Sequence, residues 1–285
     1  MDQPKVFVII LNYNGRACLK KALVSVFRMD YPNFEVILVD NNSIDGSFEM
    51  IKREFSKIIL IKNSENLGFS SGNNIGIEYA LERGADYIWL LNYDTEIEKN
   101  SLDFLVEEME KEEKIGIISP VILAGDSGKI WFSGGEINWL KMKSQHQEKE
   151  LQKNNFNTDY ISGCAMLIRA EVFRRAGLFD EDYFLYWEDA DFSLRAKKAG
   201  YKLAVCASSR IRHYEKSQEK KASKIYWLVL SGLIFFKKNS PLFLKPWIFL
   251  YIKLRKIKNW KERRCEKTAL NEAVGRAYQD FKNII

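Results

Sequence analysis

The sequence predicts an α/β protein with a mostly parallel central sheet that is flanked by helices on both faces. Short apolar runs rich in β-branched residues recur through the N-terminal part of the chain, and such continuous runs are typical of strands buried on both faces. Stretches with a helical spacing of apolar residues separate these runs, and glycine turns such as Asp45-Gly46 and Gly84 mark their limits. The regular alternation of strand and helix therefore predicts a doubly wound half.

The expected elements follow from these runs in chain order. Strands are expected at residues 5–11, 34–39, 58–61, 87–91, 116–123 and 201–207. Helices are expected at residues 18–27, 47–55, 73–83, 101–111, 171–176 and 189–199. Residues 141–157 are polar and only weakly periodic, so we expect a mobile loop there.

The composition is that of a globular protein, with 46% hydrophobic and 29% charged residues in 285. The four cysteines are far apart and form no CxxC pair, and the chain holds only two histidines, which together disfavour a structural zinc site. The chain opens on a predicted strand and not on a secretory signal. We therefore expect reduced thiols and a cytoplasmic location.

Charge is distributed unevenly and predicts two domains, 1–215 and 216–285. The net charge is +6, but residues 216–285 alone hold 17 lysines and arginines against 5 acidic residues. Their apolar runs, 225–236 and 242–252, are shorter than the about 20 residues that span a bilayer, and they contain Trp227, Trp247 and Tyr251. This pattern predicts peripheral association with the inner face of the cell membrane, whereas the alternative is two amphipathic helices packed on the body. Nucleic-acid binding through this region is disfavoured, because apolar runs between the cations suit lipid better than a phosphate groove.

Polar residues follow four successive predicted strands, where open α/β sheets bind their ligands. Asp40 at one strand end is expected either to accept hydrogen bonds from a nucleoside or to cap a turn. The segment 68–74 leads into a helix, so its amides suit a phosphate, although an ordinary glycine turn is the alternative. Asp94 suits Mg²⁺ or Mn²⁺, unless it caps the next helix.

A second group of candidates lies near residue 190. Glu188, Asp189 and Asp191 directly follow an aromatic run, and an apolar wall raises the pKa of a carboxyl toward that of a useful general base. The alternative is a set of acids that stabilise a helix N-terminus. Arg195 lies four residues after Asp191, and the two are expected to pair on one helix face.

Taken together, these segments resemble glycosyltransferase family 2, and most closely its rhamnosyltransferase-like branch. The similarity covers roughly residues 5–214 in the order of the family. The segments that carry it are 8–15 (VIILNYNG), 39–43 (VDNNS), 45–47 (DGS), 66–69 (NLGF), 72–73 (GN), 91–95 (LNYDT), 162–166 (SGCAM), 179–181 (FDE) and 188–191 (EDAD).

The resemblance implies a GT-A fold, which has a Rossmann-like sheet, here followed by a basic helical extension. It also implies an inverting sugar transfer that depends on a divalent cation, Mg²⁺ or Mn²⁺. Asp189 would be the catalytic base, and Asp94 and His213 would be metal ligands. Asn92 replaces the first acid of the family's metal-binding motif, which puts the metal affinity in question. The residues expected to bind the donor nucleotide are Asn12, Tyr13, Asn14, Asp40, Asn42, Gly68, Gly72, Asn73 and Asn92, and those expected in the acceptor and sugar pocket are Gly163, Cys164, Trp187 and Glu188.

The expected donor is a UDP- or dTDP-linked sugar, and the expected acceptor is a saccharide or a lipid-linked glycan of cell-surface polysaccharide synthesis. Two alternatives stay open. One is a sugar nucleotidyltransferase, although the turn 12–15 lacks the basic glycine-rich pattern of those enzymes. The other is a degenerate, membrane-tethered protein that binds nucleotide sugars without catalysis, which Asn92 alone motivates. The sequence does not indicate an oligomeric state.

Overall fold

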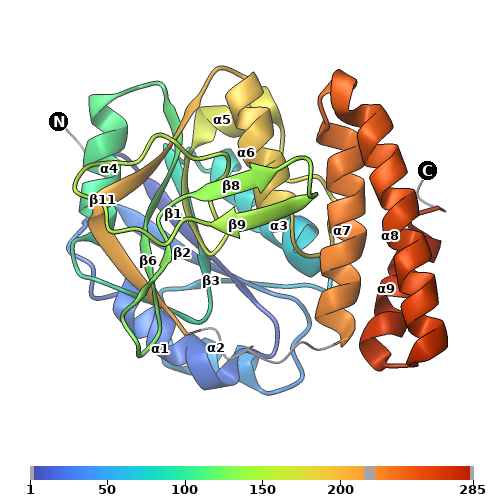
Figure 1. The fold of residues 1–285 in the computed structure, drawn as a ribbon. Coiled ribbons are helices and arrows are strands. Elements are labelled where there is room, and N and C mark those ends of the chain that lie inside the picture. Colours follow the sequence, from blue (N-terminus) through green and yellow to red (C-terminus); the bar gives the residue numbers. More distant parts are fainter. Residues whose placement is uncertain (1–2, 215–221, 283–285) are drawn as a thin grey trace.

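The computed structural model describes residues 3–214 and 222–282. In this part of the chain, a nine-stranded sheet runs through the N-terminal body in the order β3-β2-β1-β4-β10-β6-β11-β5, with β7 added alongside β6 (Figure 1). The strands β1 to β4 are mutually parallel, whereas β10 is antiparallel to both of its neighbours. The predicted mostly parallel α/β sheet is confirmed in its N-terminal half.

The strands of this sheet have the following bounds: β1 Val6–Asn12, β2 Phe34–Asp40, β3 Ile59–Lys62, β4 Tyr87–Asn92, β5 Thr95–Ile97, β6 Ile115–Ala124, β7 Ile130–Phe132, β10 Ala165–Arg169 and β11 Lys202–His213. A separate two-stranded sheet pairs β8 (Gly135–Asn138) with β9 (Lys143–His146). The central strands β1, β4 and β6 are buried along nearly their whole length, as continuous apolar runs predict.

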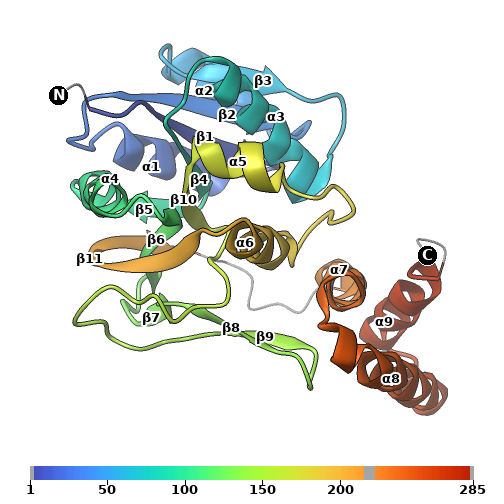
Figure 2. The same cartoon turned by 90° about the horizontal axis from the view of Figure 1, so that it is seen from above.

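Helices cover both faces of the sheet (Figure 2). One face carries α1 (Arg16–Val26), α2 (Ser47–Glu54) and α4 (Ser101–Lys111). The other face carries α3 (Gly68–Glu82), α5 (Ala170–Ala176) and α6 (Glu188–Lys198). This arrangement brings the carboxyl ends of β1, β2 and β4 to one edge of the sheet, beside the start of α6.

Three expectations about the elements were wrong. The helix expected at 73–83 begins already at Gly68, because the Asn66 side chain accepts a hydrogen bond from the Gly68 amide at 3.0 Å. The strand expected at 201–207 continues to His213, so this histidine is the last residue of the strand. Of the segment 141–157, expected to be a mobile loop, residues 143–146 form β9, which pairs with β8 in a hairpin.

The C-terminal region folds into α7 (Ala222–Asn239), a short 3₁₀ helix η1 (Leu242–Leu244), α8 (Lys245–Cys265) and α9 (Ala269–Asp280). Helix α7 packs on the body, where Trp187 contacts Phe235 and Phe236 at ring distances of 4.7 and 5.0 Å. Helices α8 and α9 stand outside α7 (Figure 2). No described helix is long and apolar enough to cross a bilayer. The predicted domain boundary at 215–216 lies outside the described residues, so the two-domain division stays a prediction.

Candidate active site

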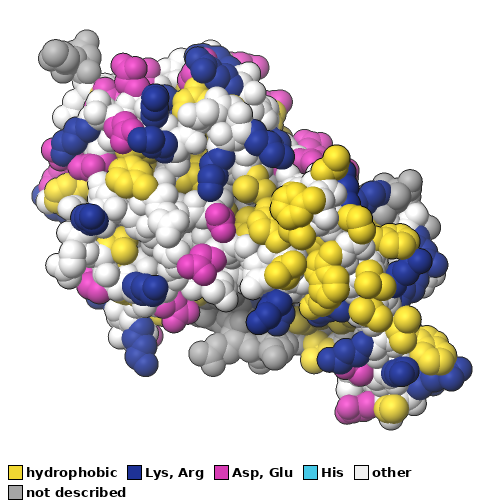
Figure 3. Space-filling view, turned by 45° about the horizontal axis from the view of Figure 1, so that its top comes forward, with side chains coloured by type: hydrophobic (Ala, Val, Ile, Leu, Met, Phe, Trp, Pro, Cys, Tyr) yellow, Lys and Arg dark blue, Asp and Glu magenta, His cyan; other side chains and the backbone are white. Residues whose placement is uncertain are grey.

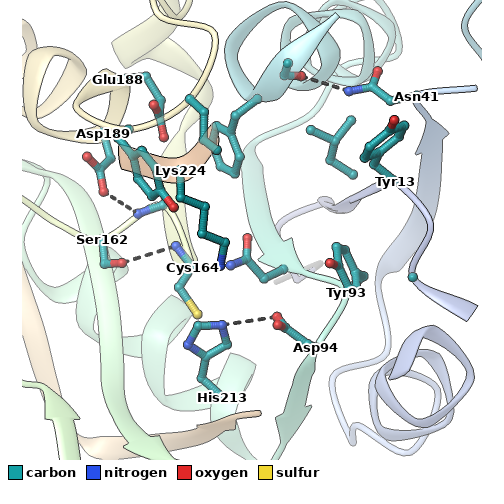
Figure 4. Close-up of a pocket in the computed structure, with 18 of the residues that line it drawn as sticks. Tyr13, Asn41, Tyr93, Asp94, Ser162, Cys164, Glu188, Asp189, His213 and Lys224 are labelled. Atoms are coloured by element: carbon teal, nitrogen blue, oxygen red, sulfur yellow. Dashed lines mark hydrogen bonds and ion pairs between the residues drawn. The ribbon is translucent and has the colours of Figure 1, made fainter. Parts of the chain in front are cut away.

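A cavity of about 680 Å³ opens at the carboxyl ends of β1 and β4, facing the start of α6. Its volume is in the range of typical ligand pockets. Figure 4 shows that its walls come from segments far apart in the chain. The predicted site residues that line it are Tyr13, Asn14, Gly68, Asn92, Asp94, Gly163, Cys164, Glu188, Asp189 and His213.

Asn12 and Asp40 lie beneath this cavity and do not line it. Both are fully buried, and the Asn12 amide nitrogen donates to Asp40 Oδ2 at 2.6 Å and to Ser47 Oγ at 2.8 Å. The other Asp40 oxygen accepts from the Ser43 amide at 2.8 Å. This network fixes the turns after β1 and β2. In this structure Asp40 therefore caps a turn, which was the alternative to nucleoside binding. Its direct contact with a nucleoside stays a prediction.

Four other candidates also lie outside the cavity wall. Asn42 is exposed, and its amide donates to the Ser64 carbonyl. Gly72 packs against Leu11 and allows α3 to approach the sheet, while Asn73 is buried and donates to a carbonyl of its own helix. Trp187 is buried against α7. Their predicted contacts with donor or acceptor stay predictions.

The first turn of α3 is already hydrogen-bonded within the protein. The Gly68 amide donates to Asn66, and the Phe69 amide donates to the Phe184 carbonyl at 2.7 Å. A side chain at Gly68 would collide with that carbonyl, and the φ of Gly68 is +78°, so glycine is required here. These two amides therefore have protein partners, and the predicted phosphate contact would need other donors of this turn.

Asp94 and His213 meet in the cavity from β-strand ends that are far apart in sequence. His213 Nε2 lies 3.1 Å from Asp94 Oδ1, and both side chains are largely buried (Figure 4). Burial lowers the pKa of His213, but the neighbouring Cys164 and Asp94 outweigh it and raise that pKa to about 11. This place therefore attracts positive charge, whether a proton or a metal ion.

The donor set decides what kind of cation would fit. Asp94 Oδ1 and His213 Nδ1 are buried and make no well-formed hydrogen bond, and carboxylate and imidazole are both ligands for Mn²⁺. Within residues 3–214 and 222–282, no group of three or more His, Cys, Asp and Glu residues is arranged to hold a metal. The pair consequently fits a cation that takes its remaining ligands from the phosphates of a substrate and from water.

Asp189 and Glu188 begin α6 and line the same cavity. Asp189 Oδ2 accepts from the Gly163 amide at 3.0 Å, and its Oδ1 accepts from the Ala190 amide at 2.7 Å. Burial raises the pKa of Asp189, and these amides act in the opposite direction. Burial, together with the charge of Asp189, also raises the pKa of Glu188, whose Oε2 has no hydrogen-bond partner. The expected pairing of Asp191 with Arg195 is confirmed at 2.7 Å.

Several cavity residues were not predicted from the sequence. Asn41 holds the start of α3 through its donation to the Gly68 carbonyl at 2.9 Å, and it lies within the resembling segment 39–43. Trp131, His146 and Lys224 reach the cavity from β7, β9 and α7, where no pattern in the sequence marked a site. Lys224 extends into the cavity from the C-terminal helices (Figure 4).

Comparison with known proteins gives the fold and the family. The family model described as Glycosyl transferase family 2 matches residues 7–177, which is more than half of the chain. The chain is 25% identical to the N-acetylglucosaminyl-diphospho-decaprenol L-rhamnosyltransferase of Mycobacterium tuberculosis over 232 residues, 73% of this chain and 75% of the relative. It is 24% identical to the dTDP-rhamnosyl transferase RfbF of Shigella flexneri over 209 residues, 73% of this chain and 68% of the relative.

Among solved structures, GalNAc-T7 with UDP, GalNAc and Mn²⁺ superposes with a TM-score of 0.67 at 20% identity. The match covers 83% of this chain and 48% of that one, so the chain spans about half of that protein. This likeness confirms the predicted GT-A fold, and the two relatives confirm the rhamnosyltransferase-like branch. The chain therefore belongs to glycosyltransferase family 2.

Proposed function

We propose that this glycosyltransferase moves a sugar from a nucleotide diphosphate to a saccharide or lipid-linked acceptor, with inversion and with the help of Mg²⁺ or Mn²⁺. One observation carries the proposal. The Asp94–His213 pair and the Asp189 carboxylate face one cavity, although they come from the turn between β4 and β5, from β11 and from α6. A site for a phosphate-bound cation and a site for a general base thus share one cavity.

Asp189 is the proposed base. The acceptor hydroxyl has a pKa far above neutrality, so it must lose its proton as its oxygen attacks the anomeric carbon. The Gly163 and Ala190 amides hold the Asp189 carboxylate in one orientation, which fixes where the acceptor hydroxyl has to lie. Attack from the Asp189 side, with the nucleotide leaving from the Asp94 side, inverts the configuration at the anomeric carbon.

The leaving diphosphate gains negative charge as the sugar departs, and the surroundings of Asp94 and His213 suit that charge. Asp94 and His213 would hold the cation, which neutralises the diphosphate when it is bound. Lys224 adds a protein cation to the same cavity. Preorganised positive groups of this kind stabilise charge that develops in the transition state without having to reorganise.

The relatives support a more specific substrate pair. The names of the Shigella flexneri and Mycobacterium tuberculosis relatives indicate a dTDP-rhamnosyl donor in one and a diphospho-decaprenol acceptor in the other. By extension, we propose a dTDP- or UDP-linked sugar as the donor and an isoprenoid-linked glycan as the acceptor.

A lipid-linked acceptor requires access to a membrane, and η1 and helix α8 together supply a suitable surface. Figure 3 shows hydrophobic side chains gathered over the C-terminal helices, with lysines and arginines around them. Leu242 and Phe243 are 82% and 80% exposed, and Leu250 and Ile257 are also exposed. Apolar side chains beside cations bind the interface of anionic bilayers. We place the protein at the inner face of the cell membrane as a peripheral protein.

A thermal-shift experiment tests donor and metal binding together. Purified protein is heated with UDP-, dTDP- or GDP-linked sugars, each in the presence of Mn²⁺, Mg²⁺ or EDTA. The proposal expects one nucleotide to raise the melting temperature, and EDTA to remove that rise. If no nucleotide stabilises the folded protein under any condition, the proposed donor class is wrong.

A further inference from the structure

A second cavity, of about 760 Å³, lies between α7, α8, α9 and the tip of the β8–β9 hairpin. We call it the C-terminal cavity. Its volume is again that of a small-ligand site. Its walls are largely apolar, and they include Leu228, Leu233, Phe236, Leu254 and Val274. Such walls favour a hydrocarbon occupant, because a polar ligand would lose its hydration there without compensation.

The charged residues that line this cavity come from the hairpin and from α8. Lys143 comes from the hairpin, and Arg255 and Lys258 come from α8. Glu262 is the acid among the lining residues, and it lies 3.6 Å from Lys258. An apolar interior with a predominantly cationic margin is complementary to an amphiphile that has a hydrocarbon chain and a phosphate head.

Trp187 gives independent evidence for a ligand. The side chain lines the C-terminal cavity and is only 7% exposed, yet its indole Nε1 has no hydrogen-bond partner. The indole nitrogen packs against Gly232, which lines the same cavity and where an added Cβ would lie only 3.1 Å from that nitrogen. Because buried donors are nearly always satisfied, an acceptor oxygen on an occupant of the cavity would supply the partner that this N–H lacks.

The C-terminal cavity adjoins the active site. Trp187 directly precedes Glu188 and Asp189, which line the catalytic cavity. Tyr160 connects the two sites from another side. Burial raises the pKa of Tyr160, the charge of Asp189 raises it further, and a hydrogen bond with Ser144 of the C-terminal cavity lowers it. Trp187 thus lines the C-terminal cavity, while its chain neighbours Glu188 and Asp189 line the catalytic cavity.

We infer that the C-terminal cavity binds the isoprenoid chain and the adjoining phosphate of the lipid-linked acceptor. The chain lies between α7, α8 and α9, the phosphate lies near Arg255 and Lys258, and the sugar reaches toward Asp189. This inference rests on the proposed function, since it gives the acceptor of that reaction its binding site. It differs from the contact of α8 with the bilayer surface, because it requires one lipid chain to leave the membrane.

Photolabelling tests the binding site without any reaction. Farnesyl diphosphate that carries a benzophenone is irradiated with the full-length protein, and labelled peptides are mapped by mass spectrometry. We expect labels on α7, α8 and α9, and we expect Arg255→Glu/Lys258→Glu to reduce them at least about tenfold. Lys253→Glu/Lys261→Glu is the matched control, because it makes the same charge change on the same helix outside the cavity. Equal losses in both variants would overturn the inference.

Competition against the photolabel shows whether the cavity recognises an isoprenoid diphosphate, free diphosphate or the surface of an anionic bilayer. Inorganic diphosphate or vesicles of anionic phospholipid should compete much less well than unlabelled farnesyl diphosphate. Equal competition by inorganic diphosphate would reduce the site to an anion-binding surface, and equal competition by the vesicles would reduce it to a bilayer contact. Leu254→Glu adds a charge to a half-exposed apolar wall, and it should also lower labelling at least about tenfold.

Kinetics separates this inference from the proposed function. The same acceptor sugar is offered on a long isoprenoid diphosphate and on a short, water-soluble aryl diphosphate. Arg255→Glu/Lys258→Glu should lower the ratio of the two kcat/KM values at least about tenfold, while the control keeps the wild-type ratio. A wild-type enzyme that is labelled but transfers to neither acceptor would contradict the proposed function alone. An active enzyme with an unchanged ratio in the variant would contradict the cavity alone.

Discussion

His213 Nε2 lies 3.1 Å from Asp94 Oδ1, at the point where the end of β11 and the turn after β4 bring the two side chains into one cavity. The two residues are far apart in sequence. Among the ion pairs of the described residues, neither has a second partner of opposite charge. The sheet thus builds a cation-attracting pair next to a general-base candidate.

This pair predicts how metal binding responds to mutation. Asp94→Asn and His213→Gln should each weaken Mn²⁺-dependent donor binding by more than about tenfold, since even the loss of an outer-shell partner costs that much. Isothermal titration with the donor nucleotide, with and without Mn²⁺, measures the effect. Glu98→Gln is the control, because Glu98 is exposed and does not line the cavity. Donor affinity that is equal in all variants and insensitive to EDTA would remove the pair as metal ligands.

Because Lys224 of α7 lines the cavity, we predict that the C-terminal helices contribute to donor affinity. A cation beside the diphosphate makes charge-assisted hydrogen bonds that contribute about 1.5–3 kcal/mol. Lys224→Ala should therefore raise the KM for the donor about tenfold or more. Lys237→Ala, at the exposed end of the same helix, controls for a general loss of charge. Equal KM values in the two variants would show that Lys224 does not act on the donor.

The raised pKa of Asp189 predicts the acid side of the pH profile. The base acts only when it is deprotonated, so kcat/KM falls as the pH drops through its folded-state pKa. Since burial raises this pKa, the fall should lie above the value of about 3.9 for an ordinary Asp. Stopped assays across a pH series locate the fall. A profile that stays flat down to the ordinary value would contradict the assignment.

Glu188 and Asp189 are neighbours, and their roles can be separated. Burial and the charge of Asp189 raise the pKa of Glu188, which favours a neutral carboxyl there. Gln imitates a neutral Glu, so Glu188→Gln should keep activity within about tenfold, far less than the loss expected from removing a general base. A larger loss than that of the equivalent change at Asp189 would make Glu188 the base. Initial rates at saturating donor decide between them.

Asp191 has a structural role that is measurable by unfolding. Its carboxylate is buried, accepts from Arg195 Nε at 2.7 Å and from Asn239 at 2.8 Å, and so joins α6 to α7. Asp191→Ala should lower the free energy of unfolding by about 3 kcal/mol. This is the low end of the range for breaking a buried ion pair, because the Arg195 side chain keeps some exposure. Glu171→Ala breaks an exposed pair with Arg174 and should cost less than about 1 kcal/mol. Urea unfolding followed by circular dichroism compares the two; equal losses would contradict the role of Asp191.

The order of strands and helices in the N-terminal half could be predicted from the sequence because it depends on local apolar runs. The strand β10 was missed, since its segment is short and pairs antiparallel with strands that are distant in sequence. The position of α7 also depends on tertiary contacts. Its apolar run equally suits a membrane interface, but Trp187 and the body bury its face.

The site was predicted where it follows strand ends and missed where it depends on packing. Asp94 and Asp189 line the cavity as expected, whereas Asp40 is turned beneath it by donors from Asn12 and Ser43. That difference depends on side-chain hydrogen bonds that no sequence pattern specifies. Lys224 was missed for the same reason, because only the packing of α7 brings it to the cavity.

Asp189→Asn tests the central claim most directly. Initial rates of sugar transfer and the affinity for the donor nucleotide are measured on the same preparations of wild-type and variant protein. The account predicts that transfer falls by about a hundredfold or more while donor affinity changes little, because the amide keeps the shape of the carboxylate but accepts no proton. Transfer at nearly the wild-type rate would contradict it.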